Sequence, residues 1–369
     1  MDSALAAIVD RIRAASADRR PLRIRGGGSK DFYGGRLDGE LLSTAALAGI
    51  SSYEPSELVV TVRAGTLLAE LEAVLAERGQ CLPFEPPHYG GVQGSTATVG
   101  GMVAAGLSGP ARASAGSVRD YVLGMTLVNG QAQVLQFGGQ VMKNVAGYDV
   151  SRLMAGALGT LGLVAEVSLK VLPVAPGEAT LAFELDQVQA LERLNAWGGQ
   201  PLPLNASHWM NVGGTPILRL RLRGAVAAVE AACRTLGGER LDNAVAAADW
   251  ALCRDQQLPW FAARGGRALW RLSVPQTAPV LDLPEPPLVE WHGGQRWVRA
   301  AAADAGAIRA AAVQAGGHAT LFIANNDLPT RGIATFDVIS APLQQIQRAL
   351  KRQFDPAGIF NPGRLSPDF

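Results

Sequence analysis

The residues of this chain whose type and spacing are best suited to a chemical role are glycines, and the role would be to bind a ligand through the backbone. They are concentrated in three segments of the first half, Arg25–Lys30, Gly94–Gly101 and Gly156–Gly162, each beside a predicted strand. A residue without a Cβ lets backbone N–H groups approach a phosphate closely and adopts positive φ at little cost. Three such loops can therefore converge on one large phosphate-bearing cofactor. The alternative is a set of tight turns in an ordinary α+β domain.

The two commonest nucleotide-binding motifs are absent from the 369 residues. No G-x-G-x-x-G run occurs, as a nicotinamide-type Rossmann domain would require. A P-loop is excluded because no lysine follows a glycine; the four lysines are Lys30, Lys143, Lys170 and Lys351. The glycine segments therefore indicate a different kind of cofactor site.

The cysteines and histidines do not predict a metal site. They are scattered, without a C-x-x-C and without the spacing that zinc or an iron–sulfur cluster requires: Cys81, Cys233, Cys253, His88, His208, His292 and His318. No His/Asp or paired-carboxylate constellation can be selected as an acid or base, and His208 is interpreted as a half-buried histidine. We therefore predict no metal and name no catalytic residue.

Composition and charge exclude several classes of partner. The chain is 48% hydrophobic and 18% charged, as an ordered globular protein would be. Its 33 basic and 32 acidic residues leave a net charge of +1, which argues against nucleic acid as a partner. No stretch of about 18 apolar residues occurs, so no membrane span is predicted. Met1–Arg20 has the pattern of an amphipathic helix rather than of a signal peptide, and the expected location is the cytoplasm.

Local patterns predict the elements that carry the glycine segments. Apolar residues at helical spacing predict a helix over Thr66–Arg78, with Thr66 as its N-cap. Asn129-Gly130 predicts a tight hairpin turn between strands at 122–128 and 132–137. This first half is therefore expected to combine strands and helices around the cofactor loops.

The chain changes in texture beyond a boundary at Pro173–Gly177. Strand candidates there alternate with alanine-rich helices, which predicts an antiparallel sheet backed by helices. Leucine and arginine alternate over Ile217–Arg223, so one face of this strand should be buried and the other solvated or facing a partner. The turn-rich end of the chain, Phe354–Leu365, is expected to pack back on the body.

Several runs of residues resemble the FAD domain of the vanillyl-alcohol oxidase and p-cresol methylhydroxylase (PCMH) superfamily, over about residues 20–173. These runs are Pro21–Ser29, Thr98–Gly106, Gly116–Gly124 and Lys143–Gly162. Within that superfamily the chain is similar to the FAD-binding E subunits of bacterial glycolate oxidase, also called glycolate dehydrogenase. The narrower match is carried by Val141–Asp149 and Phe360–Arg364.

The resemblance implies an α+β fold, with a PCMH-type two-subdomain FAD-binding domain and an α+β cap domain built of an antiparallel sheet and helices. We expect the FAD-binding domain at residues 1–173, the cap at 174–345 and a C-terminal tail at 346–369 that returns to the FAD domain. The FAD should be non-covalent, because the first loop has Ser29-Lys30 where covalently flavinylated members usually have a histidine.

The resemblance also implies roles for single residues. Gly26–Ser29 would present backbone N–H groups to the pyrophosphate, and Lys30 would contribute a charge. Gly100 and Gly101 would form a second anion site at the start of a helix. The expected FAD-binding residues are Arg25, Gly26, Gly27, Gly28, Ser29, Lys30, Gly94, Ser95, Thr96, Thr98, Val99, Gly100, Gly101, Gly106, Ser117, Gly159, Gly162, Val164 and Asn361.

The implied activity belongs to a complex, in which this chain, a homologous catalytic FAD subunit and an iron–sulfur subunit oxidise glycolate, a small 2-hydroxy acid, to glyoxylate. Related 2-hydroxy-acid dehydrogenases hold a metal with a His-x-His pair in the cap, and this chain has no such pair. We therefore expect an electron-relaying or structural subunit, cytoplasmic or peripheral at the inner face of the cell membrane through the complex. Two alternatives stay open: a self-sufficient FAD-dependent 2-hydroxy-acid dehydrogenase, and a scaffolding subunit without a redox role.

Overall fold

The computed structural model describes residues 2–90, 95–139, 149–324 and 333–367, which form two compact units. Unit 1 consists of residues 1–107, 117–173 and 338–369, and unit 2 of residues 108–116 and 174–337. The units differ from the expected domains in two places. Residues 108–116 group with unit 2, and residues 338–345 group with unit 1.

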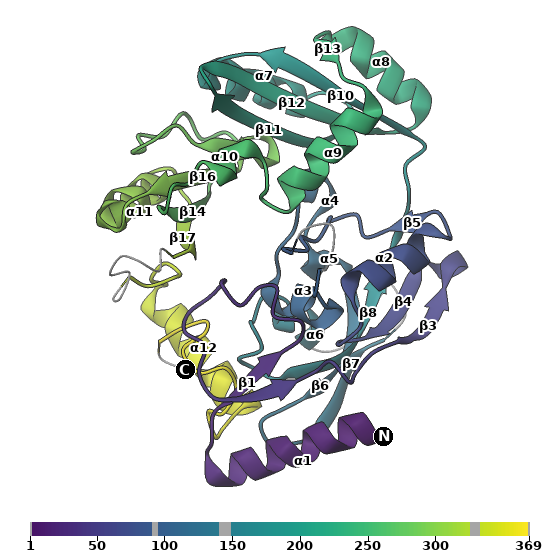
Figure 1. Ribbon diagram of the computed structural model, residues 1–369, viewed down its shortest axis with the longest axis vertical. Coiled ribbons are helices and arrows are strands. Elements are labelled where there is room, and N and C mark those ends of the chain that lie inside the picture. Colours follow the sequence, from purple (N-terminus) through teal and green to yellow (C-terminus); the bar gives the residue numbers. More distant parts are fainter. Residues whose placement is uncertain (1, 91–94, 140–148, 325–332, 368–369) are drawn as a thin grey trace. The chain divides into compact units, whose positions relative to one another are not determined.

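Unit 1 is built on an antiparallel five-stranded sheet of order β3-β4-β8-β6-β7 (Figure 1). Its strands are β3 (Ile50–Glu54), β4 (Val59–Arg63), β6 (Val122–Val128), β7 (Val134–Gly138) and β8 (Leu163–Lys170). Helices α2 (Leu68–Ala76) and α3 (Val99–Ala105) contribute Leu71 and Val103 to a core that also contains Val167 of β8. This core supports the glycine segments that follow β1 and flank α3.

Short strand pairs and further helices complete unit 1. β1 (Leu22–Arg25) is parallel to β2 (Glu40–Ser43), and β5 (Gln80–Cys81) is antiparallel to β9 (Leu172–Pro173). The remaining helices are α1 (Ser3–Asp18), η1 (Pro55–Glu57), α5 (Val118–Tyr121), α6 (Val150–Met154) and α12 (Ala341–Phe354). The amphipathic helix predicted at the N-terminus is confirmed, since α1 buries Ile8 and Ile12 in a cluster with Leu22 and Phe360.

Two local predictions for unit 1 need correction. Helix α2 begins at Leu68, because the Thr66 hydroxyl does not cap it but exchanges hydrogen bonds with the backbone of Gly49 at 2.9 and 3.1 Å. The second predicted strand of the hairpin begins at Val134 instead of residue 132, so the β6–β7 loop covers residues 129–133, and the N–H of Asn129 donates to the carbonyl of Gln133 at 3.1 Å. Both predicted elements exist, but the helix and the second strand begin two residues later than predicted.

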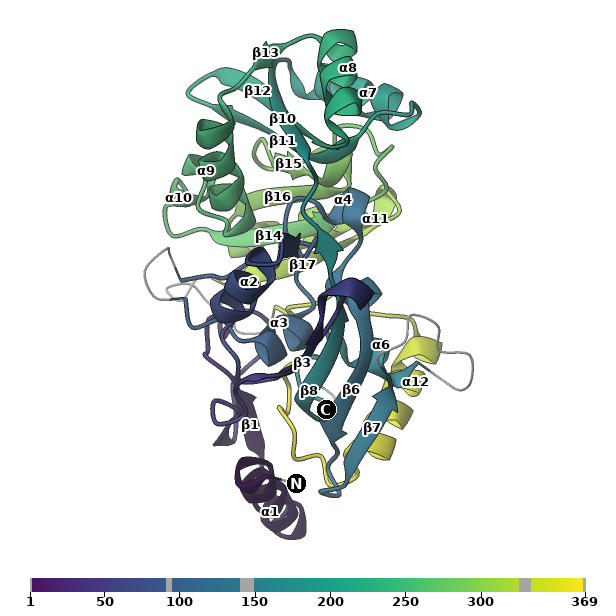
Figure 2. The same ribbon diagram turned by 90° about the vertical axis from the view of Figure 1, so that its right-hand side faces the viewer.

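Unit 2 contains an antiparallel eight-stranded sheet of order β13-β10-β12-β11-β15-β16-β14-β17 (Figure 2). Its strands are β10 (Gly177–Glu184), β11 (Leu204–Val212), β12 (Thr215–Gly224), β13 (Glu239–Arg240), β14 (Ala268–Ser273), β15 (Leu288–Glu290), β16 (Gln295–Ala300) and β17 (His318–Ile323). Its helices are α4 (Arg112–Ala115), α7 (Gln187–Gly198), α8 (Val226–Leu236), α9 (Asn243–Arg254), α10 (Pro259–Ala262), η2 (Trp291–Gly293), η3 (Ala302–Asp304) and α11 (Ala305–Gln314). The predicted antiparallel sheet backed by helices is confirmed.

The alternating strand β12 is covered on more of its surface than predicted. Leu218, Leu220 and Leu222 are fully buried, as expected for one face. On the other face Arg221 is also buried, with its guanidinium 4.8 Å from the ring centre of Trp250 in α9. The arginine face is therefore a polar layer inside unit 2 at this position and not a solvated surface.

None of the described helices is long and apolar enough to cross a lipid bilayer. Over the same residues, no three His, Cys, Asp or Glu side chains are grouped so that they could hold a metal ion.

Candidate functional site

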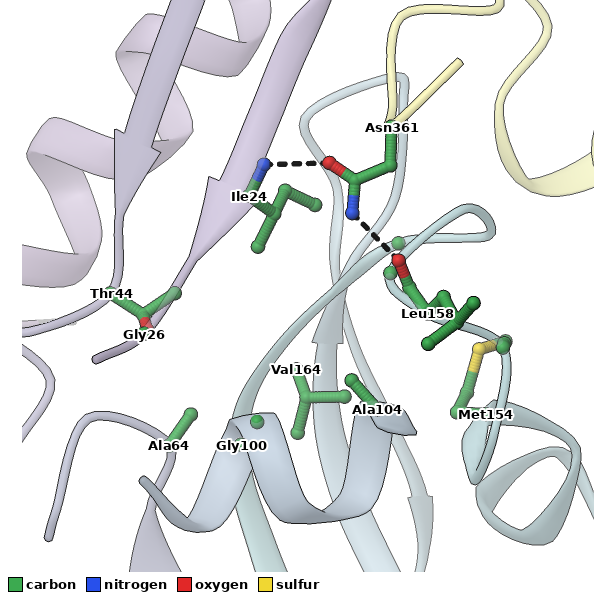
Figure 3. A pocket seen from close by; sticks show the side chains of 14 residues that line it. Ile24, Gly26, Thr44, Ala64, Gly100, Ala104, Met154, Leu158, Val164 and Asn361 are labelled. Atoms are coloured by element: carbon green, nitrogen blue, oxygen red, sulfur yellow. Dashed lines mark hydrogen bonds between the residues drawn. The ribbon is translucent and has the colours of Figure 1, made fainter. Parts of the chain in front are cut away.

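Two adjoining pockets in unit 1 lie where β1, α3 and the segment after α6 meet, and Figure 3 shows the inner one. The inner pocket, lined by Thr44, Ala64 and Val164 among others, encloses about 510 Å³ including its open mouth. The outer pocket, lined by Arg25–Asp31 among others, encloses about 550 Å³ on the same basis. Six residues line both: Ile24, Gly26, Gly101, Ala104, Leu158 and Asn361.

The first glycine loop follows the end of β1 and packs directly on the second glycine segment. A Cβ on Gly26 would overlap the side chain of Thr98, and a Cβ on Gly27 would overlap the backbone carbonyl of Thr96. The Thr96 hydroxyl also donates to the carbonyl of Gly27 at 2.8 Å. In the part of the chain that the structure describes, the backbone N–H groups of Gly26–Ser29 donate to no protein acceptor. All four residues line the outer pocket, so their N–H groups are candidate donors to a ligand there.

The outer pocket carries a positive charge. Its lining residues include three cations, Arg25, Lys30 and Arg364, against the single carboxylate of Asp31. Arg25 Nε lies 2.8 Å from Asp31 Oδ2, which leaves two cationic groups in excess. The Arg364 guanidinium donates to the carbonyl of Asp31 at 2.9 Å and to that of Lys30 at 3.2 Å, so it also holds the loop in place. This electrostatic field favours an anionic ligand.

Helix α3 brings the second glycine segment to the pockets, but its first N–H groups are already bonded. The N–H of Gly100 donates to the carbonyl of Ala64 at 2.8 Å, and the N–H of Gly101 donates to the Thr98 hydroxyl at 3.2 Å. The expectation that Gly100 and Gly101 form a second anion site is therefore wrong about the donors. At Gly100 and Gly101, α3 instead offers a stretch of wall without side chains, against which a ligand can lie closely.

The third glycine loop is joined to β1 by Asn361. The Asn361 side chain accepts from the N–H of Ile24 at 2.8 Å and donates to the carbonyl of Leu158 at 2.7 Å (Figure 3). Leu158 has φ 51°, a left-handed conformation that is rare outside glycine. A Cβ on Gly159 would lie 2.7 Å from Asn361 Nδ2. The side chain of Asn361 thus fixes the separation of the two loops, in addition to lining both pockets.

The expected FAD-binding residues fall into three groups. Those that line a pocket are Arg25, Gly26, Gly27, Gly28, Ser29, Lys30, Thr98, Gly100, Gly101, Gly159, Gly162, Val164 and Asn361. Those that line neither pocket are Ser95, Thr96, Val99, Gly106 and Ser117. Gly106 ends α3 with φ 66°, and Ser117 caps α5 through Asp120. Gly94 and residues 140–148, which contributed to the family resemblance, lie outside the described residues.

Several lining residues were not predicted. They are Ile24, Asp31, Leu37, Thr44, Ala64, Ala104, Ala105, Met154, Ala157, Leu158 and Arg364. Ala104 could have been found, since it follows Gly100 by one helical turn and so shares its face of α3. Thr44 and Ala64 carry no such signal, because β-strand pairing brings them to the pocket from separate parts of the chain.

Comparisons with known proteins agree with this geometry. Residues 4–138 match the FAD binding domain family. The chain is 44% identical over 359 residues to the glycolate oxidase subunit GlcE of Escherichia coli (strain K12), which covers 97% of this chain and 96% of that protein. The chain belongs to the GlcE family. It is therefore an FAD-binding subunit of an oxidoreductase, as the sequence predicted.

Two further relatives of this GlcE-family chain match less than half of it. The glycolate oxidase subunit GlcD of Bacillus subtilis (strain 168) is 29% identical over 178 residues, 47% of this chain and 37% of that protein. The D-lactate dehydrogenase of Anaerostipes hadrus is 31% identical over 151 residues, 41% of this chain and 30% of that protein. A solved structure of alkyldihydroxyacetonephosphate synthase covers 96% of the chain and 75% of its own, with a TM-score of 0.64 and 15% identity. That likeness shows the fold alone, and it confirms the predicted fold class.

The pocket residues fit FAD. The free N–H groups of Gly26–Ser29 suit a diphosphate, and the excess of Arg25, Lys30 and Arg364 over Asp31 suits its negative charge. The glycine walls at residues 100–101 leave room for flat rings to lie against the backbone.

Gly101→Ala is expected to separate FAD affinity from stability. A Cβ at Gly101 would meet only Thr98 Oγ1, at 3.2 Å, so the fold tolerates it after a small shift of that hydroxyl. Within a helix, alanine is more stable than glycine by about 0.5–1 kcal/mol. The methyl group would nevertheless narrow both pockets. We expect the FAD-free protein to melt at the same or a higher temperature while the Kd for FAD rises about tenfold. Thermal melting and a fluorescence titration measure the two effects, and an unchanged Kd would contradict the placement of this wall.

The GlcE-family chain has buried polar groups in unit 2 that sequence spacing did not indicate. His208 is buried, and its Nε2 lies 2.9 Å from Asp249 Oδ2. Arg219 forms an ion pair with the same carboxylate. Burial acts to raise the pKa of Asp249, but the hydrogen bonds from His208 and Arg219 outweigh it and the pKa is lowered. His208 is therefore fully buried instead of half-buried, and it pairs with a carboxylate inside unit 2, while its Nδ1 has no hydrogen-bond partner within the described residues.

A second polar group in unit 2 surrounds Glu290. Its carboxylate accepts from the Cys253 thiol at 2.9 Å and from the side-chain amide of Gln295 at 2.6 Å, and it also accepts from the indole N–H of Trp297. Burial raises the pKa of Glu290 and that of the Cys253 thiol. All of these groups are enclosed in unit 2, so they stabilise its interior instead of presenting an acid or base to a substrate.

Proposed function

We propose that this chain is the FAD-binding subunit of a glycolate oxidase complex that oxidises glycolate to glyoxylate, and that its own role is electron-relaying or structural. The observation that carries the proposal is the row of unbonded N–H groups at Gly26–Ser29 beside a cationic pocket mouth. It occurs in a chain that matches a glycolate oxidase subunit over nearly its whole length. FAD, when bound, would supply the capacity to accept and pass on electrons.

The chain's own residues would bind, orient and shield the cofactor. The N–H groups of Gly26–Ser29 would hold the diphosphate, with Lys30 and Arg364 balancing its charge. Asn361 would keep the first and third loops at the separation that admits the ligand. The binding is non-covalent, because the first loop carries Ser29 and Lys30 where a tethering histidine would be needed.

The pocket linings support a role other than substrate oxidation. Taking a hydride from a 2-hydroxy acid requires a base for the hydroxyl proton. Among the lining residues of the two described pockets there is no histidine, and the carboxylate of Asp31 is paired with Arg25. We therefore assign substrate oxidation to a second, homologous FAD subunit, for which the similarity to GlcD offers a candidate class, and onward electron transfer to an iron–sulfur subunit.

Two measurements on the purified chain test this proposal. The chain should be yellow, and it should release all its FAD on denaturation. It should reduce an artificial acceptor with glycolate only in the presence of the partner subunits. Appreciable glycolate turnover by the chain alone would favour a self-sufficient dehydrogenase. A colourless protein that cannot be reconstituted with FAD would leave only scaffolding.

A further inference from the structure

A buried lysine connects the segments from which the walls of the two pockets are built. Lys351 in the last turn of α12 is buried, and its ammonium donates three hydrogen bonds. The acceptors are the carboxylate of Asp355 at 2.7 Å, the carbonyl of Thr160 at 2.7 Å and the carbonyl of Phe360 at 2.9 Å. All three N–H bonds of the ammonium are therefore used within the protein.

Asp355 completes this arrangement from the other side. It is buried, and its carboxylate accepts from the N–H groups of Ile359 at 3.1 Å and Phe360 at 2.8 Å, as well as from Lys351. The backbone of Gly130 also lies against it, since a Cβ there would be 2.5 Å from Asp355 Oδ1. The turn that leads into the tail is thus folded around one carboxylate.

The two carbonyls bound by Lys351 belong to segments that line the pockets. Thr160 lies between Gly159 and Gly162, both on the wall of the inner pocket. Phe360 directly precedes Asn361, whose side chain joins Ile24 at the end of β1 to Leu158 in the third loop. One ammonium therefore fixes the third loop and the tail together.

We infer that the Lys351–Asp355 pair positions the walls of the FAD pocket, so that FAD affinity depends on two residues that line neither pocket. This rests on the proposed function, since it takes FAD as the ligand. A buried ion pair is costly to desolvate, so it often stabilises a fold no more than an apolar contact would. It does, however, hold its hydrogen-bond partners in one defined arrangement. An apolar side chain at residue 351 would fill the space but would leave the carbonyls of Thr160 and Phe360 without a donor. Both residues are positioning residues, because they act through Asn361 and the third loop.

The experiment uses the full chain in three variants. Lys351→Met removes the ammonium, and Asp355→Asn keeps the volume of the carboxylate while removing its charge, so it serves where the first variant is unstable. Leu75→Ala is the matched control, because Leu75 is a fully buried residue of α2 in the same unit and lines neither pocket. The measurements are the Kd for FAD by fluorescence quenching and, in the FAD-free protein, hydrogen exchange of the peptides covering residues 22–26 and 359–363.

We expect Lys351→Met and Asp355→Asn to raise the Kd at least tenfold and to accelerate exchange in both peptides at least tenfold. Leu75→Ala should lower the unfolding free energy while leaving the Kd and the exchange of these peptides within about threefold of wild type. A wild-type Kd in the two variants, or an equal loss of affinity in Leu75→Ala, would overturn the inference. If the wild-type chain takes up no FAD, the proposed function fails, and the exchange measurement still decides whether the pair fixes the tail.

Discussion

Gly27→Ala should remove most of the affinity of this chain for FAD. A Cβ at this position would overlap the backbone carbonyl of Thr96 and would lie 2.8 Å from the Thr96 Cβ. Backbone atoms cannot rotate away as a side chain can, so the first loop and the second segment would have to move apart. The hydrogen bond from the Thr96 hydroxyl to the Gly27 carbonyl would then be lost, and the N–H groups of Gly26–Ser29 would change direction.

The expected size of this effect follows from the loss of several donors at once. We expect the Kd for FAD to rise about 100-fold or more, which corresponds to about 2.7 kcal/mol. Flavin content after purification and a fluorescence titration measure it. Gly306→Ala is the control, because a Cβ there, in helix α11, meets nothing within 4 Å. A Gly27→Ala protein that binds FAD within about threefold of wild type would show that this loop does not hold the diphosphate.

The glycine segments could be recognised in the sequence because close backbone approach requires glycine, and the enrichment in glycine leaves a trace in the composition. The overlap that any Cβ would cause at Gly26 and Gly27 is the physical reason for that trace. The use of each N–H group could not be predicted in the same way. The acceptor for Gly100 is Ala64, which strand pairing brings to the helix from another segment. The sequence therefore identified the wall at α3 but assigned it the wrong chemistry.

Asn129-Gly130 shows the same limit at a turn. The dipeptide is a strong local signal for a hairpin, and β6 and β7 do form one. Its glycine, however, is also needed for a contact that is distant in sequence, since a Cβ on Gly130 would lie 2.8 Å from the Cα of Asp355. One residue serves a turn and a tail contact, and only the turn can be predicted from neighbours in the chain.

The C-terminal tail was predicted to pack back on the body, and the structure confirms it. The N–H of Leu22 donates to the carbonyl of Ile359 at 2.7 Å, and the N–H of Asn361 donates to that of Leu22 at 2.9 Å. The buried pair that fixes this tail was not predicted. Lys351 looks the same in a sequence whether it is solvated or buried, and Asp355 precedes a proline as many turn residues do.

The histidines of unit 2 were predicted to be isolated, which is correct along the chain but incomplete in space. His208 and Asp249 are separated by 41 residues and still form a hydrogen bond, because α9 packs against the sheet that contains β11. A pattern that depends on spacing cannot detect such a pair. Only the three-dimensional structure shows that these two side chains are buried together.

His292 should make unit 2 lose stability in mild acid. It lies in η2 with φ 54°, is buried, and has its Nε2 3.1 Å from the Ser114 hydroxyl. Its Nδ1 has no hydrogen-bond partner within the described residues. Burial lowers the pKa of His292 from its ordinary value of 6.5 to about 4. The folded unit therefore keeps this imidazole neutral at pH values where the unfolded chain already protonates it.

The sign and size of the effect follow from this difference. Between pH 6.5 and about pH 4 the unfolded state binds more protons than the folded state, so the free energy of unfolding falls as the pH falls. At pH 4 this pKa difference lowers the free energy of unfolding by about 3 kcal/mol. All seven tryptophans lie beyond residue 173, so denaturant titrations followed by tryptophan emission report on unit 2. His292→Asn tolerates positive φ and does not titrate in this range. Between pH 7 and pH 4 the free energy of unfolding of this variant should fall by about 3 kcal/mol less than that of the wild type. An equal fall in both proteins would show that His292 is protonated in the folded unit.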